Sequence, residues 1–287
     1  MSNTIRILLL EGNLRINCER AVAHGTLSSG DRYAKSLKFV CPDIEFDKFY
    51  AADTDCEPPS GENLSGYDGV VLGGSGLHAY DDDPAVTRQI EFIKTVFSAG
   101  VPMLGSCWGM QIATLAAGGQ VKASPLGRET GIGRKIALSV EGQSHPFFTD
   151  KSAVFDSPSI HLDEVTTVPD GAIVLASNAH SRIQALSFKS GRSEFWGVQY
   201  HPEFDLFHMG RLAVMNSDLL LDGGFHLNLD DVHAHADMME TLHANPSRTD
   251  LAWKMGIDQD VLSDEYRTLE IKNWVERSVV PYKVSRT

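Results

Sequence analysis

Short apolar runs alternate with amphipathic helical segments through the first 106 residues, and this alternation limits the possible fold more than any other feature of the chain. Four runs have the length and composition of strands: residues 5–11, 43–50, 67–76 and 101–106. Two segments between them, residues 30–40 and 83–100, have helical spacing. The order of strand, helix and strand predicts a parallel sheet that helices cover on both faces.

The pattern changes near residue 132 and again near residue 208. Four further runs with tight connections predict an antiparallel excursion, at residues 132–140, 172–178, 184–188 and 195–201. Residues 208–221 then predict a helix that closes the domain. We therefore expect one domain over residues 1–221 and a helical C-terminal extension over residues 222–287. The extension either offers a surface to a partner or covers an apolar face of the domain.

Composition excludes two classes of partner. The net charge is −13, from 25 basic and 38 acidic residues. Such a chain is poorly suited to neutralise nucleic-acid phosphates or to dock on an anionic membrane. The four cysteines show no CxxC spacing, and the apolar run near the start is too short for a signal-peptide core or a membrane span. These features predict free thiols and a cytoplasmic location.

One cysteine, Cys107, stands between Gly105 and Gly109 at the predicted junction of a strand and a helix. A nucleophile at such a turn lies above the end of the sheet and faces the positive end of the helix. The helix dipole and the free N–H groups there are expected to lower the pKa of the thiol. The alternative is an inert cysteine at a strand end, and it leaves the two glycines without a purpose.

A thiol nucleophile needs an imidazole base and a group that orients the imidazole. His201 ends the predicted strand at residues 195–201, and Glu203 follows after a proline. Glu203 can reach back to the ring of His201, fix its tautomer and stabilise its cation. The alternative for this pair is a structural cap at the end of the strand.

A glycine cluster, Leu72–Gly76, ends another predicted strand. Backbone N–H groups exposed there can stabilise an oxyanion, together with the N–H of Trp108 just after the cysteine. The cluster is not a phosphate loop, because no GxxxxGK[ST] pattern occurs in the chain.

The segments GSCWGMQ, LGGSG and WGVQYHPE resemble the motifs of the class I, triad-type glutamine amidotransferases. More narrowly, these motifs resemble those of stand-alone proteins described as similar to the amidotransferase half of GMP synthase. The resemblance covers roughly residues 5–210. It implies an α/β fold of flavodoxin-like type, a three-layer sandwich with a mostly parallel central sheet.

The resemblance also implies residue roles. Cys107 would attack the side-chain amide of L-glutamine, and His201, held by Glu203, would protonate the departing ammonia. A γ-glutamyl thioester would remain, and His201 would activate the water that hydrolyses it. The N–H groups of Gly74 and Trp108 would form the oxyanion hole. The remaining family positions would contact the substrate: Gln111, Gly76, His161 and Leu162.

The implied function is a glutaminase that supplies ammonia to a separate synthetase or acceptor-using enzyme. A second hypothesis keeps the thioester but changes the substrate: a γ-glutamyl hydrolase or transferase acting on γ-glutamyl amides, small amines or hydroxylamine. A third is an idle scaffold of the same fold, which the complete Cys107, His201 and Glu203 set disfavours. A cysteine protease or a DJ-1-like protein is more remote still.

No cofactor is implied by these motifs, and we expect no metal. Four histidines of the extension, His226, His233, His235 and His243, lack the spacing of a transition-metal site. Trp108 stands where the family more often has leucine, and its side chain is expected either to narrow the pocket or to join a partner surface.

Overall fold

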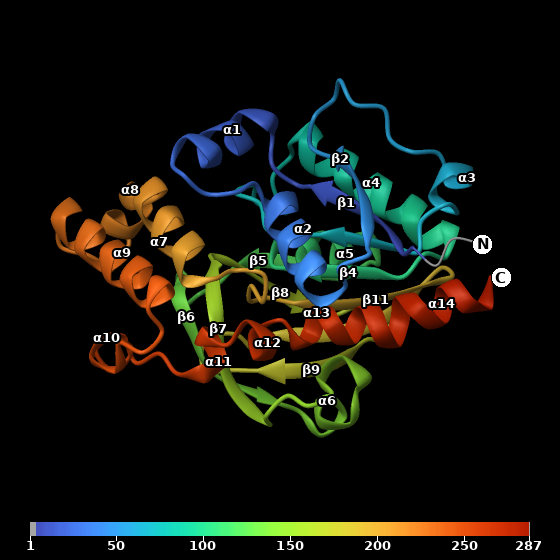
Figure 1. Cartoon of the computed structure of the whole chain (residues 1–287). Coiled ribbons are helices and arrows are strands. Elements are labelled where there is room, and N and C mark those ends of the chain that lie inside the picture. Colours follow the sequence, from blue (N-terminus) through green and yellow to red (C-terminus); the bar gives the residue numbers. More distant parts are fainter. Residues whose placement is uncertain (1–3, 287) are drawn as a thin grey trace.

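A computed structural model of the protein describes residues 4–286 (Figure 1). Its strands are β1 (Arg6–Glu11), β2 (Glu45–Tyr50), β3 (Gly69–Leu72), β4 (Met103–Ser106), β5 (Gln120–Ala123), β6 (Glu129–Leu138), β7 (Val154–His161), β8 (Asp163–Thr167), β9 (Ile173–Ser177), β10 (Ala185–Ser190) and β11 (Ser193–Val198). Nine of them form one sheet in the order β2-β1-β3-β4-β11-β10-β9-β6-β7, while β5 and β8 pair separately.

The helices fall into three groups along the chain. The first half contains α1 (Arg15–Ala23), α2 (Ser29–Val40), α3 (Gly61–Leu64), α4 (Pro84–Ala99) and α5 (Trp108–Ala116). The antiparallel region contains α6 (Val140–Ser144) and the 3₁₀ helix η1 (Pro146–Phe148). The last group comprises α7 (Leu206–Met215), α8 (Ser217–Asp222), α9 (Leu229–Ala244), α10 (Thr249–Met255), α11 (Gln259–Leu262), α12 (Asp264–Arg267), α13 (Leu269–Trp274), the π-helix η2 (Val275–Val279) and α14 (Val280–Ser285).

The predicted change of strand direction occurs within one sheet. β1 pairs in parallel with both β2 and β3, and β4 pairs in parallel with β3 and β11. From β11 onward, through β10, β9, β6 and β7, every pairing is antiparallel. The parallel strands bring the ends of β3, β4 and β11 to one edge, so the predicted glycine cluster, cysteine and histidine meet there.

Side chains on opposite faces of β1 enter different layers of the core, as the pleat of a strand requires. Leu8 and Leu10 pack with residues of α4 and α5, including Phe92 and Ile112. Ile7 and Leu9 pack on the other face with residues of α2 and α13. Helices therefore cover both faces of a largely parallel sheet, and the predicted α/β three-layer sandwich is confirmed.

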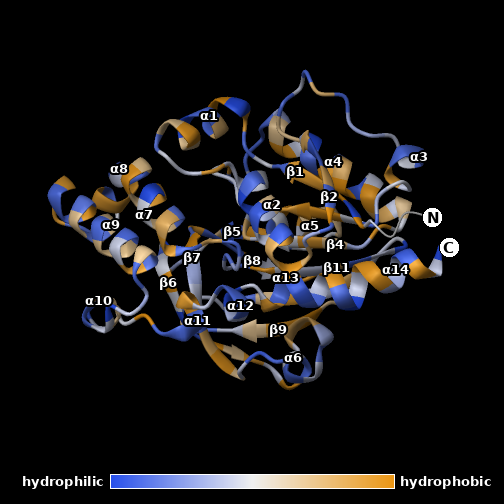
Figure 2. Cartoon of the chain, in the orientation of Figure 1, coloured by the Kyte–Doolittle hydropathy of each residue, from blue (hydrophilic) through white to orange (hydrophobic). Residues whose placement is uncertain are grey.

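The C-terminal segment from α13 to α14 crosses one face of the sheet and ends near the start of β1 (Figure 1). Hydrophobic and hydrophilic bands alternate along it (Figure 2). Trp274 is fully buried, and a Cβ on Gly69 of β3 would lie 2.6 Å from its ring. Residues of α13 and η2 thus share the core of the sheet, whereas α9 to α11 pack with α7 in a separate apolar cluster. The boundary near residue 221 stays a prediction.

A buried polar contact also ties this segment to the strand end that carries His201. Glu270 of α13 is fully buried and accepts a hydrogen bond of 2.6 Å from the hydroxyl of Tyr200. Its other carboxylate oxygen lies 3.0 Å from Nζ of Lys151. The residue just before His201 is therefore held by a helix that lies some seventy positions later in the chain.

Trp274→Ala is expected to lower the free energy of unfolding by about 3–5 kcal/mol, because it leaves a cavity against the sheet. Denaturant unfolding would measure the change. Trp253→Ala is the matched control: Trp253 is 88% exposed, and its removal is expected to cost less than about 0.5 kcal/mol. Equal losses in the two variants would contradict a core role for the C-terminal segment.

Two local features differ from the expectations. The helix α1 has little amphipathic character and was not predicted. The helical C-terminal extension is not continuous over residues 261–279, because the extended residue Ser263 ends α11 and its hydroxyl caps α12 by accepting from Tyr266 N–H. Among residues 4–286, no helix is long and apolar enough to cross a bilayer.

Candidate active site

Cys107 occupies the turn between β4 and α5 with φ of 50° and ψ of −105°, a conformation that non-glycine residues rarely adopt. The neighbouring glycines serve close packing. A Cβ on Gly109 would lie 2.0 Å from the carbonyl oxygen of Leu72, and one on Gly105 would lie 2.6 Å from the backbone of Gly109. The strand and helix can therefore approach closely enough to form the predicted sharp turn, with the strain carried by the cysteine itself.

His201 and Glu203 form a buried pair, with 1% and 4% of their surfaces exposed. Glu203 Oε1 lies 2.8 Å from His201 Nδ1 and also accepts a 3.0 Å hydrogen bond from Ser106 Oγ. The other ring nitrogen, Nε2, has no hydrogen-bond partner among the described residues. The carboxylate thus orients the ring and leaves Nε2 available for proton transfer.

The His201 ring is packed between Phe204 on one side and the backbone of Gly74 close by. Phe204 stacks on it with ring centroids 4.0 Å apart and an interplanar angle of 8°. On the glycine cluster, a Cβ on Gly74 would lie 2.8 Å from His201 Cε1. A side chain at residue 74 would push the imidazole out of place, which explains why glycine is needed there.

The predicted lowering of the Cys107 thiol pKa is wrong for this arrangement. Burial raises the pKa of the thiol to about 12, and the negative charge of Glu203 acts in the same direction. The Trp108 N–H lowers the pKa by a smaller amount. The Cys107 Sγ lies 3.7 Å from the carbonyl oxygen of Ile160. The resting thiol therefore keeps its proton, and it would need a base in order to act as a nucleophile.

A cleft of about 400 Å³ opens over Cys107 and His201. It brings together seven of the nine predicted residues: Gly74, Gly76, Cys107, Gln111, His161, Leu162 and His201. The other two, Glu203 and Trp108, do not line it; Glu203 reaches the cleft only through His201.

The expectation that the Trp108 side chain narrows the pocket or joins a partner surface is wrong. The indole is fully buried, and its Nε1 donates a 2.9 Å hydrogen bond to Gln89 Oε1. Its backbone N–H is the first of α5, where no carbonyl of the helix can accept from it. The Trp108 N–H hydrogen-bonds to the Cys107 sulfur, which fits the predicted oxyanion role.

Gln111 lies one helical turn beyond Cys107, on the floor of the cleft. Its amide nitrogen donates to the Asp163 carbonyl oxygen at 2.9 Å and to Gln199 Oε1 at 3.3 Å. The side chain thereby holds the start of β8 against α5. A direct contact between Gln111 and substrate stays a prediction.

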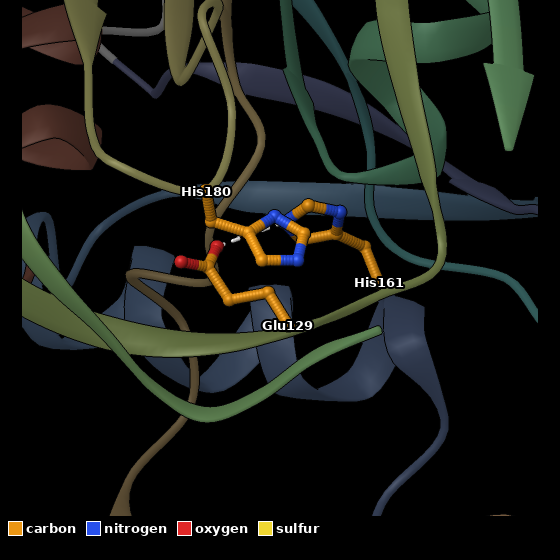
Figure 3. A group of neighbouring side chains, drawn as sticks. All are labelled: Glu129, His161 and His180. Atoms are coloured by element: carbon orange, nitrogen blue, oxygen red, sulfur yellow. Dashed lines mark hydrogen bonds and ion pairs between the residues drawn. The ribbon is translucent and has the colours of Figure 1, made fainter. Parts of the chain in front are cut away.

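His161 belongs to a polar cluster with Glu129 and His180, whose ligand atoms lie within 4.8 Å of one another (Figure 3). His161 Nε2 lies 2.9 Å from Glu129 Oε2, and its Nδ1 lies 3.0 Å from the Asp163 carbonyl oxygen. Both ring nitrogens of His161 are therefore engaged, and the ring is anchored between β6 and the start of β8. A metal ion at this cluster would have to break the His161–Glu129 hydrogen bond.

Both carboxylate oxygens of Glu129 have hydrogen-bond partners without a metal ion. Its carboxylate accepts from His161, Ser159, Gln184 and Asn178. Burial raises the pKa of Glu129, but the hydrogen bond and charge of His161, followed by those two amides, outweigh it and lower the pKa to about 2. The carboxylate is therefore ionised at neutral pH, and the cluster is a rigid wall beside the cleft.

The sequence did not predict the two hydrogen bonds by which Asn13 holds the glycine cluster. Asn13 Nδ2 donates to the Gly74 carbonyl oxygen at 3.1 Å, and Asn13 Oδ1 accepts from Gly76 N–H at 3.1 Å. Asn13 is held in turn by Glu11, a fully buried carboxylate that also accepts from Gly30 N–H. The signal was a charged residue, Glu11, directly after the apolar run of residues 7–10, which indicates a buried polar network.

Comparison with known proteins places this geometry in a family. Residues 41–217 match the family described as Glutamine amidotransferase class-I. The chain is 36% identical over 282 residues to gamma-glutamyl-L-1-hydroxyisopropylamide hydrolase from a Pseudomonas species, covering 96% of this chain and 94% of that protein. It is 34% identical over 158 residues to one subunit of the glutamine-hydrolyzing GMP synthase of Saccharolobus solfataricus, covering 54% and 79% of the two chains.

Among solved structures, a glutamine amido transferase from Methylobacillus flagellatus superposes with a TM-score of 0.62. It is 19% identical and the match covers 99% of this chain and 95% of that one. At this identity the likeness concerns the fold alone. The family match over residues 41–217, in contrast, is a match of sequence, and the three motifs lie within that range. The chain belongs to the class I glutamine amidotransferase family.

Proposed function

We propose that the protein hydrolyses γ-glutamyl amides, glutamine among them, through a γ-glutamyl thioester on Cys107. One observation carries the preference for substituted amides over glutamine alone. Beyond His201 the cleft continues along α7 and α8, where Leu212, Met215 and Leu219 line it. Ammonia gains no binding energy from an apolar wall, whereas the carbon substituent of a larger amine is stabilised when it is buried against one. The similarity to a γ-glutamyl amide hydrolase over nearly the whole chain supports the same substrate class.

The acylation step uses the groups in the cleft. Cys107 Sγ attacks the amide carbon while its proton passes to His201 Nε2, and the charge on the carbonyl oxygen is met by the N–H groups of Gly74 and Trp108. The C–N bond then breaks as His201 returns the proton to the departing amine. Because the thiol pKa is raised, deprotonation by His201 accompanies attack, and Glu203 stabilises the imidazolium.

Deacylation repeats the sequence with water. His201 takes a proton from water, the hydroxide adds to the thioester carbon, and the C–S bond breaks as the thiolate regains the proton. The products are glutamate and the free amine. Arg128 and Asp163 line the same cleft and supply charges opposite to those of the α-carboxylate and α-amino groups of the γ-glutamyl half.

A second function rests on the relative from Saccharolobus, which is part of a GMP synthase. In this alternative the protein is a glutaminase that releases ammonia to a separate synthetase, which activates the acceptor. The chemistry on Cys107 is identical, so the two functions differ in the preferred amine and in the need for a partner.

Glutamate release from the purified protein alone distinguishes them. We expect γ-glutamylethylamide and γ-glutamylpropylamide to be cleaved with kcat/KM at least about tenfold above that of glutamine, since their alkyl groups contact the apolar wall. A strong preference for glutamine would favour the ammonia-supplying role. Absence of glutamate from every amide would overturn the proposal, and an unreactive Cys107 in the same sample would favour an idle scaffold.

A further inference from the structure

A second cavity of about 260 Å³ adjoins the cleft, between the helices α7 to α9 and the last two strands at one edge of the sheet, β6 and β7. In Figure 1 these helices gather at the end of the molecule where β6 and β7 form the edge of the sheet. The cavity has the size of a small organic group rather than of a whole substrate.

The two spaces adjoin each other. Ile160, Phe204, Leu212 and Asn216 line both the cleft and the second cavity. Phe204 is the residue that stacks on the ring of His201, and the carbonyl oxygen of Ile160 accepts from Cys107 Sγ. Anything bound in the second cavity therefore lies directly behind the base and the nucleophile.

The lining defines what the cavity can hold. Its apolar side chains include Met209, Leu220, Phe225 and Met239, and no Asp, Glu, Lys or Arg of the described residues lines it. At one side His235 Nδ1 lies 3.4 Å from His226 Nε2. Burial lowers the pKa of His235, and the charge of His226 lowers it further, so His235 is neutral at physiological pH. An uncharged alkyl or aryl group fits this lining, whereas a carboxylate or ammonium does not.

We propose that the second cavity receives the far end of the amine substituent and makes the enzyme selective for long, apolar γ-glutamyl amides. This inference rests on the proposed hydrolysis of γ-glutamyl amides. The γ-glutamyl half stays in the cleft over Cys107, the scissile amide faces His201, and the substituent passes Leu212 and Asn216 into the space beyond. A hydroxyl at its end can hydrogen-bond to His226 or His235.

A homologous series tests the inference. With N-methyl to N-hexyl γ-glutamyl amides, kcat/KM is expected to rise up to about fourfold per methylene until the cavity is filled. Failure to cleave any N-alkyl amide would overturn both the function and this inference. Cleavage that is independent of chain length would overturn the second cavity alone and leave the function standing.

Two variants locate the effect. Ala213 lines the second cavity but not the cleft, so Ala213→Leu is expected to lower kcat/KM for the hexylamide at least about tenfold and to leave glutamine hydrolysis within about twofold. Ala234→Leu, at an exposed position of α9, is the matched control and is expected to change neither substrate. Equal losses on glutamine and hexylamide in Ala213→Leu would overturn the inference.

Phe225→Ala provides a second variant that does not add volume. Phe225 is 42% exposed and forms one wall of the second cavity, so its removal is expected to flatten the chain-length dependence without unfolding the protein. A full chain-length dependence in Phe225→Ala, with an unchanged thermal transition, would contradict the placement of the substituent.

Discussion

Cys107→Ala is expected to lower glutamate release from γ-glutamyl amides by at least about 10⁴-fold, to the level that binding and oxyanion stabilisation alone support. The variant lacks the sulfur that is proposed to form the thioester, and no other thiol stands at a turn next to an imidazole held by a carboxylate among residues 4–286. Steady-state kinetics with glutamine and an alkylamide would measure the loss, and circular dichroism would show that the fold is kept.

Chemical labelling gives an independent readout of the same residue. Incubation with 6-diazo-5-oxo-norleucine, a glutamine-like electrophile, is expected to add one adduct at Cys107, detected by mass spectrometry of the intact and digested protein. Cys41→Ala is the control, because Cys41 caps α2 away from the cleft and its loss should leave both activity and labelling unchanged. An adduct on another cysteine, or turnover retained in Cys107→Ala, would refute the assignment.

Glu203→Gln is expected to lower kcat by about 10³–10⁴-fold while changing KM little. The carboxylate now accepts from Nδ1 of His201 at 2.8 Å and offsets the charge of the imidazolium. A glutamine side chain removes that charge, and its amide N–H can turn the imidazole into the wrong tautomer, with the proton on Nε2. The loss is therefore in the reaction rather than in substrate binding.

The companion variant Ser106→Ala separates orientation from charge. It deletes only the 3.0 Å hydrogen bond to Glu203 Oε1 and keeps the carboxylate, so a loss of about tenfold is expected. Pre-steady-state measurements of thioester formation would show whether acylation slows in both variants. A Glu203→Gln enzyme no slower than Ser106→Ala would mean that Glu203 acts through packing and not through its charge.

The sequence predicted the parts of the site that local pattern determines. Cys107 sits at a strand-to-helix turn because the chain places it between a buried strand and an amphipathic helix. His201 and Glu203 lie two residues apart at a strand end, so their contact depends on little else. Parallel pairing of β3, β4 and β11 then brings the motifs to one edge, as the order of the elements predicts.

Features that depend on tertiary contacts could not be predicted from the local sequence pattern. The Cys107 thiol pKa follows from burial and from Glu203, which are not visible in a strand-to-helix junction. The indole of Trp108 points away from the cleft because Gln89, on another helix, accepts its hydrogen bond. The contact of Asn13 with Gly74 and Gly76 joins residues some sixty positions apart, and no spacing rule connects them.

The late position of α13 has a consequence for how the protein matures during translation. The ribosome delivers Cys107, His201 and Glu203 first, and residues 222–287 follow roughly 3 to 13 seconds later at ordinary elongation rates. Until then α13 and η2 are missing from the face of the sheet that α2 also covers, and Tyr200 lacks its acceptor, Glu270. The nascent chain therefore carries all three of these side chains before the helix that holds Tyr200 is available to order the strand end beside His201.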